Sequence, residues 1–293
     1  MNDSTLSAAD AALFESRRRP LFWLAYRMLG THADAEDAVQ ETFVKWLRAD
    51  RSAIAAPAAW LTGVCTNLCI DMLRAAYRSR VDYVGAWLPE PIHTPAEGTP
   101  ETEAELASSL STAFLLLLER LTPRERAAYL LREIFDTPYP DIAETLGMSE
   151  SACRKLVSRA GSAVGRDESR HVLPIERQEM LLSAFQSAIQ NADASVLAAL
   201  LADDVRLSAD GGGRATAVRR ELAGKQEVLR FIEQGLFRFW RDCEWTRARI
   251  NGGSGAILRE VDRTTASVSF AFDENGMLAH IYIMRNPEKL ARL

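Results

Sequence analysis

The chain has 293 residues, of which 47% are hydrophobic and 26% are charged. This length favours two or three domains, and this composition excludes a chain that is disordered throughout. No apolar run approaches the roughly 20 residues that a membrane-spanning helix requires. The first residues, Met1 to Asp10, lack the apolar stretch of a signal peptide. We therefore expect a cytoplasmic protein with no membrane partner.

Cysteine and histidine spacing gives no sign of a metal site. Cys65, Cys69, Cys153 and Cys243 form no CxxC pair, and the four histidines are scattered. Cys65 and Cys69 lie one helical turn apart, a spacing that would allow a redox pair. Small buried thiols are the favoured interpretation, and we expect neither a metal nor another cofactor.

The formal net charge of −5 is unevenly distributed. Six acidic residues and no Lys or Arg fall between Val81 and Leu110, whereas acids and bases nearly balance elsewhere. Because phosphate contacts favour basic surfaces, this charge disfavours a regulator that binds duplex DNA alone. It does not disfavour a protein that meets DNA only as part of a larger complex.

Residues 17–83 are predicted to form helices, because apolar residues recur there at helical spacing. Asp34 to Phe43 combines an acidic side with an apolar stripe; a solvated acidic face is the common outcome of that pattern. The next helix carries polar and basic residues on one side and at its end: Asn67, Asp71, Arg74, Arg78 and Arg80. Cations among aromatic residues suit single-stranded DNA. The alternative is that Asn67 and Asp71 bond each other while the aromatic side chains are core.

Residues 84–105 are rich in Pro, Thr and Glu, and predict a linker with no core of its own. A helix-turn-helix follows: Thr122 to Glu125 has the form of a capping box, Gly147 ends a short helix, and Ser149 caps the next one. The second helix of such a unit enters the major groove of DNA. Its exposed candidates for base or phosphate contact are Glu150, Ser151, Arg154, Lys155, Ser158 and Arg159. A plain helical hairpin with solvated charges is the alternative.

The pattern changes after a polar linker that ends at Pro174. Amphipathic helices are predicted over 175–191, 194–201 and 225–239, and strands dominate after them. Residues 266–272 alternate strictly, and an Asn-Gly pair separates them from a second run at 278–284, which indicates a hairpin. The last part is therefore predicted to be an α+β domain of about 115 residues, with helices first and the sheet after.

The segment Arg19 to Arg80 resembles region 2 of extracytoplasmic-function sigma factors, and Leu121 to Ala163 resembles their region 4. The resemblance implies that an acidic helix docks on the clamp helices of the largest subunit of core RNA polymerase, through Asp34, Asp37, Gln40 and Glu41. It implies that the next helix melts and reads the −10 promoter element through Asn67, Asp71, Arg74, Arg78 and Arg80. It also implies −35 recognition by Ser151, Arg154, Lys155, Ser158 and Arg159. Residues 160–165 lack the basic side chains usual in the family, which weakens the expected −35 phosphate contact.

Three further strings resemble the subgroup of these sigma factors that carries a fused SnoaL-like domain. The first lies in the linker and comprises Trp87, Leu88, Pro89, Glu90 and Pro91. The second is Asp210, Gly211, Gly212, Gly213 and Arg214, and the third is Asn286, Pro287, Glu288, Lys289 and Leu290. The resemblance implies regulation in cis by the C-terminal domain, with no separate anti-sigma factor. We expect Trp87 to dock within the chain, and Arg214 and Lys289 to meet linker acids such as Glu90.

The expected fold is a multidomain chain with two all-α sigma domains followed by an α+β SnoaL-like cone. The boundaries are region 2 at 1–85, an acidic linker at 86–110, region 4 at 111–168 and the regulatory domain at 169–293. The expected function is promoter-specific initiation in complex with core RNA polymerase and promoter DNA, without enzymatic activity. The alternative is that the C-terminal domain binds or transforms a small molecule, with polar candidates at Asp204, Glu260, Asp262 and His280.

Overall fold

The computed structural model describes residues 6–80, 83–94, 108–165 and 173–293. The chain forms two compact units. The first unit comprises residues 1–81 and 117–166, and the second comprises residues 82–116 and 167–293. The segment that leaves the N-terminal helices thus belongs to the same unit as the C-terminal domain.

The N-terminal part of the first unit is helical, as predicted. Its helices are α1 (Ala8–Leu29), α2 (His32–Arg48), the short 3-10 helix η1 (Arg51–Ala53) and α3 (Pro57–Arg80). Gly30 ends α1 in the left-handed conformation with φ of 79°, and the hydroxyl of Thr31 caps α2 by accepting from the backbone of Asp34. The apolar stripes of the three long helices meet in one core that buries Phe14, Trp46 and Leu61 completely.

The predicted helix-turn-helix is confirmed. The helices after the linker are α5 (Thr112–Leu118), α6 (Pro123–Glu133), α7 (Tyr139–Leu146) and α8 (Glu150–Gly165). Thr122 and Glu125 form a reciprocal capping box, and Gly147 turns the chain between α7 and α8 with φ of 60°. Arg126 of α6 is buried, and its guanidinium donates to the carbonyl of Met28 at 2.7 Å. This bond joins α6 to the carboxyl end of α1, where a helix dipole favours a cation.

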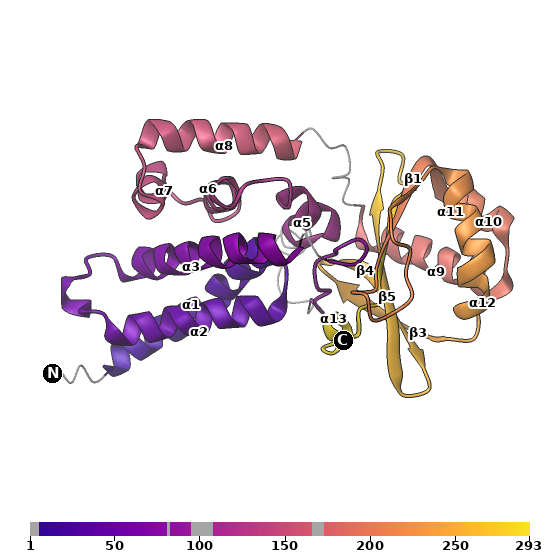
Figure 1. Ribbon diagram of the computed structural model, residues 1–293, viewed down its shortest axis with the longest axis horizontal. Helices are drawn as coiled ribbons and strands as arrows, with labels where there is room; N and C mark the ends of the chain where they lie inside the picture. The colour runs from indigo at the N-terminus through magenta and orange to yellow at the C-terminus, as the bar shows by residue number, and fades with distance from the viewer. Residues whose placement is uncertain (1–5, 81–82, 95–107, 166–172) are drawn as a thin grey trace. The chain divides into compact units, whose positions relative to one another are not determined.

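The second unit is a six-stranded sheet with α9 to α12 on one face and the short helix α13 on the other (Figure 1). Its helices are α9 (Ile175–Asn191), α10 (Ala194–Leu200), α11 (Lys225–Phe231), the π-helical turn η2 (Ile232–Leu236), α12 (Phe237–Phe239) and α13 (Pro287–Leu290). Its strands are β1 (Leu201–Asp210), β2 (Leu222–Ala223), β3 (Glu244–Ile250), β4 (Gly253–Glu260), β5 (Arg263–Phe272) and β6 (Leu278–Met284). The sheet order is β2-β1-β6-β5-β4-β3.

One strand contradicts the predicted order of helices first and sheet after. Leu201 begins β1 instead of ending a helix, and β1 pairs in parallel with β6 from the far end of the domain. Asp203 and Asp204 interrupt the apolar pattern of β1, so the strand lacks a strong local signal. The predicted hairpin of β5 and β6 is confirmed, and the side chain of Asp273 accepts two backbone bonds in its turn.

The two faces of the sheet bury different partners. One face packs on α9 to α12, with Phe185, Val268 and Ile281 in an extensive apolar core. The opposite face carries a smaller cluster that contains Tyr282, Met284, Leu290 and Leu88 of the linker. Because residues alternate along a strand, one strand serves both faces. The second face is therefore a docking surface for the linker within the same unit.

Candidate functional site

A buried carboxylate at the end of β1 gathers the linker and the C-terminal tail. Asp210 is 0% exposed and accepts four hydrogen bonds. They come from the hydroxyl of Tyr83 at 2.6 Å, the backbone of Leu88 at 3.0 Å, the backbone of Gly212 at 2.9 Å and Nζ of Lys289 at 2.7 Å. A buried charge is tolerated when it is paired and hydrogen-bonded, as here. We name this cluster the first anchor.

Lys289 completes the first anchor from α13. Its Nζ also donates to the carbonyl of Leu88 at 2.6 Å, and it lies 4.5 Å from the ring centre of Trp87. The Lys289 ammonium therefore binds the linker through its backbone and through a cation–π contact. The amide of Asn286 donates to the Tyr83 hydroxyl at 3.0 Å. Burial, followed by the nearby Asp210 carboxylate, raises the pKa of Tyr83 above its ordinary value.

The glycines between Asp210 and Arg214 allow the backbone of this loop to approach neighbouring groups closely. Gly212 has φ of 58°, and a Cβ there would lie 2.3 Å from the Asn286 side chain. A Cβ on Gly211 would lie 2.2 Å from the carbonyl oxygen of Ala215. A side chain at Gly212 would force the loop away from Asn286, and one at Gly211 would disrupt the turn of the loop itself. The motif therefore serves tight packing of two chain segments.

The two cations expected at the linker acid each have another carboxylate partner. Arg214 pairs with Glu288 at 2.7 Å, and Lys289 pairs with Asp210. Leu88 enters the apolar cluster at 3% exposure, whereas Trp87 is only half-buried. Leu88 is thus the more completely buried of the two. Pro89, Glu90 and Pro91 follow it and are buried as well.

A second anchor was missed by sequence reasoning. Asn251, in the turn between β3 and β4, accepts from the backbone of Ile92 at 2.7 Å and donates its own backbone N–H to the carbonyl of Ile92 at 2.9 Å. Thr94 donates its backbone N–H to the carbonyl of Arg249 at 3.0 Å and accepts from the backbone of Gly252 at 3.0 Å. The linker thus extends the sheet for a short distance. Asn251 has φ of 51°, and an Asn-Gly turn was the only available signal.

The acidic face of α2 is exposed at Asp37, Gln40 and Glu41. Asp34 is half-buried, and its carboxylate accepts from Thr31 in the cap of the helix. Asp34 therefore has a structural role that the other three residues lack.

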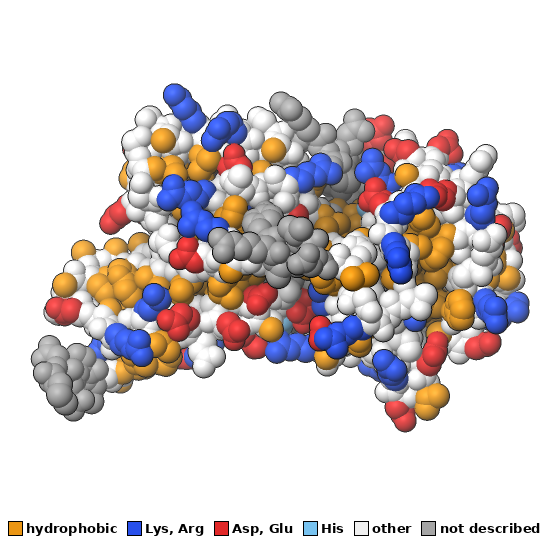
Figure 2. All heavy atoms as spheres, viewed as in Figure 1, with side chains coloured by type: hydrophobic (Ala, Val, Ile, Leu, Met, Phe, Trp, Pro, Cys, Tyr) orange, Lys and Arg blue, Asp and Glu red, His pale blue; other side chains and the backbone are white. Residues whose placement is uncertain are grey.

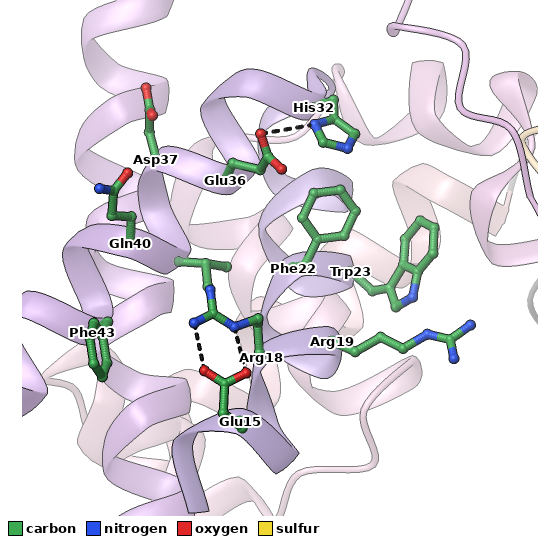
Figure 3. A pocket seen from close by; sticks show the side chains of 11 residues that line it. Glu15, Arg18, Arg19, Phe22, Trp23, His32, Glu36, Asp37, Gln40 and Phe43 are labelled. Carbon is green, nitrogen blue, oxygen red and sulfur yellow. Dashed lines mark hydrogen bonds and ion pairs between the residues drawn. The ribbon is translucent and has the colours of Figure 1, made fainter. Parts of the chain in front are cut away.

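A groove of about 780 Å³ lies beside this face, between α1 and α2 (Figure 3). Phe22 and Trp23 of α1 and Phe43 of α2 supply its aromatic lining. Glu36 pairs with His32 at 3.4 Å at one end of the groove. The sequence prediction named only residues of α2 for this surface.

The exposed face of α3 presents Asn67, Asp71 and Arg74. Asp71 and Arg74 form an exposed ion pair at 3.2 Å. Asn67 does not bond Asp71; its amide donates to the carbonyl of Thr145 in α7 at 3.1 Å. The side chains of Arg78 and Arg80 lie outside the described residues.

The predicted recognition helix α8 exposes all five expected residues. Figure 2 shows basic side chains gathered over α8 and the adjoining end of α7. Arg154 pairs with Glu150 at 2.5 Å, and Arg159 lies 3.9 Å from Glu125. Both arginine side chains are more than half exposed, so these pairs contribute little to stability.

The polar candidates for chemistry in the C-terminal domain do not form one site. Asp204, Glu260 and Asp262 are exposed. His280 lies 3.0 Å from the hydroxyl of Ser208 and stacks on Tyr282. Within the described residues there is no cluster of three metal-ligating side chains. Among all the residues that the structure describes, no helix is long and apolar enough to cross a membrane.

Comparisons with known proteins identify both helical regions of the chain. The family model for Sigma-70 region 2 matches residues 13–79, and the model for Sigma-70, region 4 matches residues 111–161. The ECF RNA polymerase sigma factor SigJ of Mycobacterium tuberculosis is 38% identical over 221 residues, which cover 75% of this chain and 70% of that protein. The probable ECF RNA polymerase sigma factor SigI of the same species is 30% identical over 285 residues, covering 96% and 94%.

The crystal structure of Mycobacterium tuberculosis SigJ is similar along nearly the whole chain. It has a TM-score of 0.73 and 33% sequence identity, and the alignment covers 96% of this chain and 98% of that one. The similarity thus includes the C-terminal α+β domain as well as both helical regions. The chain belongs to the extracytoplasmic function family of RNA polymerase sigma factors.

Proposed function

We propose that the C-terminal domain regulates this sigma factor in cis, by holding the linker between region 2 and region 4 at two anchors. As an ECF sigma factor, the chain binds core RNA polymerase and promoter DNA. The observation that carries the proposal is the buried pair of Asp210 and Lys289, which binds both the N–H and the carbonyl of Leu88. Docking of the linker limits the distance between region 2 and region 4. Because both regions must reach their promoter elements, this limit affects promoter binding.

The docking energy is well suited to a reversible restraint. Leu88 contributes apolar burial, and the linker backbone contributes hydrogen bonds worth about 0.5–1.5 kcal/mol each. Because the linker is tethered, its effective concentration is about millimolar and weak contacts suffice. A restraint within the chain would take the place of a separate anti-sigma factor.

We propose that core polymerase docks on Asp37, Gln40 and Glu41, with the groove beside α2 as the apolar part of the interface. Buried aromatic anchors inside a polar rim are the usual anatomy of a strong interface. Phe22 and Trp23 fit that role from α1. Asp34 contributes indirectly, because its cap fixes the start of α2.

For the −10 element, we propose that Asn67, Asp71, Arg74, Arg78 and Arg80 contact melted DNA. Asn67 must first release the carbonyl of Thr145, so promoter opening and separation of α3 from α7 are coupled. Permanganate reactivity of −10 thymines in the open complex tests this role. Unchanged melting after Arg74→Ala combined with Arg78→Ala would contradict it.

For the −35 element, the proposed contacts are Ser151, Arg154, Lys155, Ser158 and Arg159 of α8. All are exposed on α8, the second helix of the helix-turn-helix, and the second helix of such a unit enters the major groove. Loss of a base contact relaxes specificity at one position, whereas loss of a phosphate contact weakens binding to all sequences alike.

We propose no catalytic role for the C-terminal domain. The face of the sheet beneath α9 to α12 is packed with apolar side chains. Asp204, Glu260 and Asp262 are exposed instead. Incubation of the whole protein with metabolite mixtures, followed by mass spectrometry, tests for turnover.

Transcription in vitro with core polymerase tests the regulatory proposal. Leu88→Glu places a charge in the docking cluster, and Val84→Glu places the same charge at a neighbouring residue that is 56% exposed. We expect the first variant to change promoter output and the second to match the wild type. Equal output from all three proteins, with cross-linking distances in the linker unchanged, would overturn the proposal.

A further inference from the structure

The ring of Tyr139 joins the three helices of the helix-turn-helix region. Tyr139 is the first residue of α7. The guanidinium carbon of Arg154, from α8, lies 4.2 Å from its ring centre, and that of Arg132, from α6, lies 5.1 Å away. Both distances lie within the range of cation–π attraction. The Tyr139 ring therefore contacts two cations beside the recognition helix.

Arg154 is held on two sides although it is 58% exposed. Its Nε and Nη2 atoms both donate to the Glu150 carboxylate, at 3.0 and 2.5 Å, while its guanidinium lies over Tyr139. A free arginine side chain loses rotamer entropy when it binds DNA, and prior ordering reduces that loss. Lys155, the next residue, has no hydrogen bond or ion pair with the described part of the chain. It therefore serves as a control cation that such contacts do not hold.

Arg132 is fixed independently of Arg154. It pairs with Asp136 at 3.0 Å and donates to the carbonyl of Thr137 at 3.2 Å. Both partners lie in the turn that leads into α7, so Arg132 holds the turn and the ring together. The position of the Tyr139 ring that contacts Arg154 is thus set by contacts within the fold and does not depend on DNA.

We propose that Tyr139 is a positioning residue for −35 recognition, whose ring orients the guanidinium of Arg154 toward the base it reads. The inference rests on the proposed assignment of α8 as the recognition helix. The ring face is the active feature, so Tyr139→Phe retains the effect and Tyr139→Leu removes it. An exposed cation–π contact corresponds to about a two- to fivefold change in affinity.

A double-mutant cycle in the polymerase holoenzyme tests the inference. Affinity for a promoter probe is measured across a panel of single-base changes in the −35 element. We expect Tyr139→Leu to lower affinity about two- to fivefold and to relax the preference at the position that Arg154→Ala also relaxes. In the Arg154→Ala background, Tyr139→Leu should have no further effect; in the Lys155→Ala background, its full effect should remain.

The possible outcomes separate the inference from the function on which it rests. If Arg154→Ala leaves every −35 preference unchanged, the assignment of α8 and the inference both fail. If Arg154→Ala acts but Tyr139→Leu adds its full effect to it, Tyr139 contacts DNA on its own and the inference alone fails. A Tyr139→Phe protein as defective as Tyr139→Leu, with wild-type helix content, also overturns it.

Discussion

Removing the ammonium of Lys289 should open the first anchor of the linker. Its Nζ lies 2.7 Å from Asp210, and the two side chains are 9% and 0% exposed. Lys289→Met keeps most of the side-chain length and removes the charge. The Asp210 carboxylate then stays buried without its cation whenever the linker is docked.

The expected magnitude follows from burial. Breaking a buried pair by removing one partner costs about 3–5 kcal/mol, which corresponds to roughly a hundred- to several-thousand-fold in the docking equilibrium. Tyr83, Leu88 and Gly212 still donate to the carboxylate, so we expect the lower end of that range. Hydrogen exchange of the Leu88 amide measures the change directly, because this amide donates to Asp210 and reports local opening.

An exposed ion pair beside the anchor provides the control. Arg214 and Glu288 are 62% and 63% exposed, so Arg214→Met should cost about 0.2–1 kcal/mol and change exchange less than about sixfold. Asp210→Asn combined with Lys289→Met should restore part of the protection, because no buried charge remains unpaired. Wild-type exchange at Leu88 in the Lys289→Met protein would refute the reasoning that the buried pair holds the linker.

Three other predictions concern separate surfaces. Reversing the charges of Asp37 and Glu41 to Lys should weaken core polymerase binding at unchanged helix content; wild-type affinity in a pull-down would contradict the docking surface. Asn251→Ala should cost about 1–3 kcal/mol at the second anchor and raise hydrogen exchange of Ile92, while Leu88 stays protected; loss of protection at both would show a single cooperative anchor. The raised pKa of Tyr83 means that its contribution to docking is complete below the ordinary tyrosine pKa of about 10 and is lost only above it. Cross-linking of the linker should therefore stay constant from pH 7 to about 10, and an earlier fall that Tyr83→Phe abolishes would contradict this.

Short-range patterns were sufficient for the helical regions and for one hairpin. The capping box at Thr122, the left-handed Gly147 and the alternation of residues 266–272 each depend on neighbours within a few positions. Local backbone preference and amphipathic spacing therefore specified the helix-turn-helix and the β5–β6 hairpin. The resemblance of three short strings to a known subgroup then identified the segments that the structure brings together as the first anchor.

Only the tertiary structure decided which residues within those segments meet. Nothing local distinguishes Glu90 from Asp210 as the partner of Lys289, because both are carboxylates in motifs distant from it. The parallel pairing of β1 with β6 places Asp210 beside the start of the tail, where backbone bonds join Asp210 to Arg285 and Asn286. A fully buried carboxylate requires a cation, whereas Arg214 and Glu288 pair at the surface. The second anchor also depends on long-range contacts, because the partners of Asn251 lie in the linker. The composition of that linker had predicted a segment with no core of its own. Long-range pairing and burial, which no window of sequence contains, thus determined the contacts of the linker.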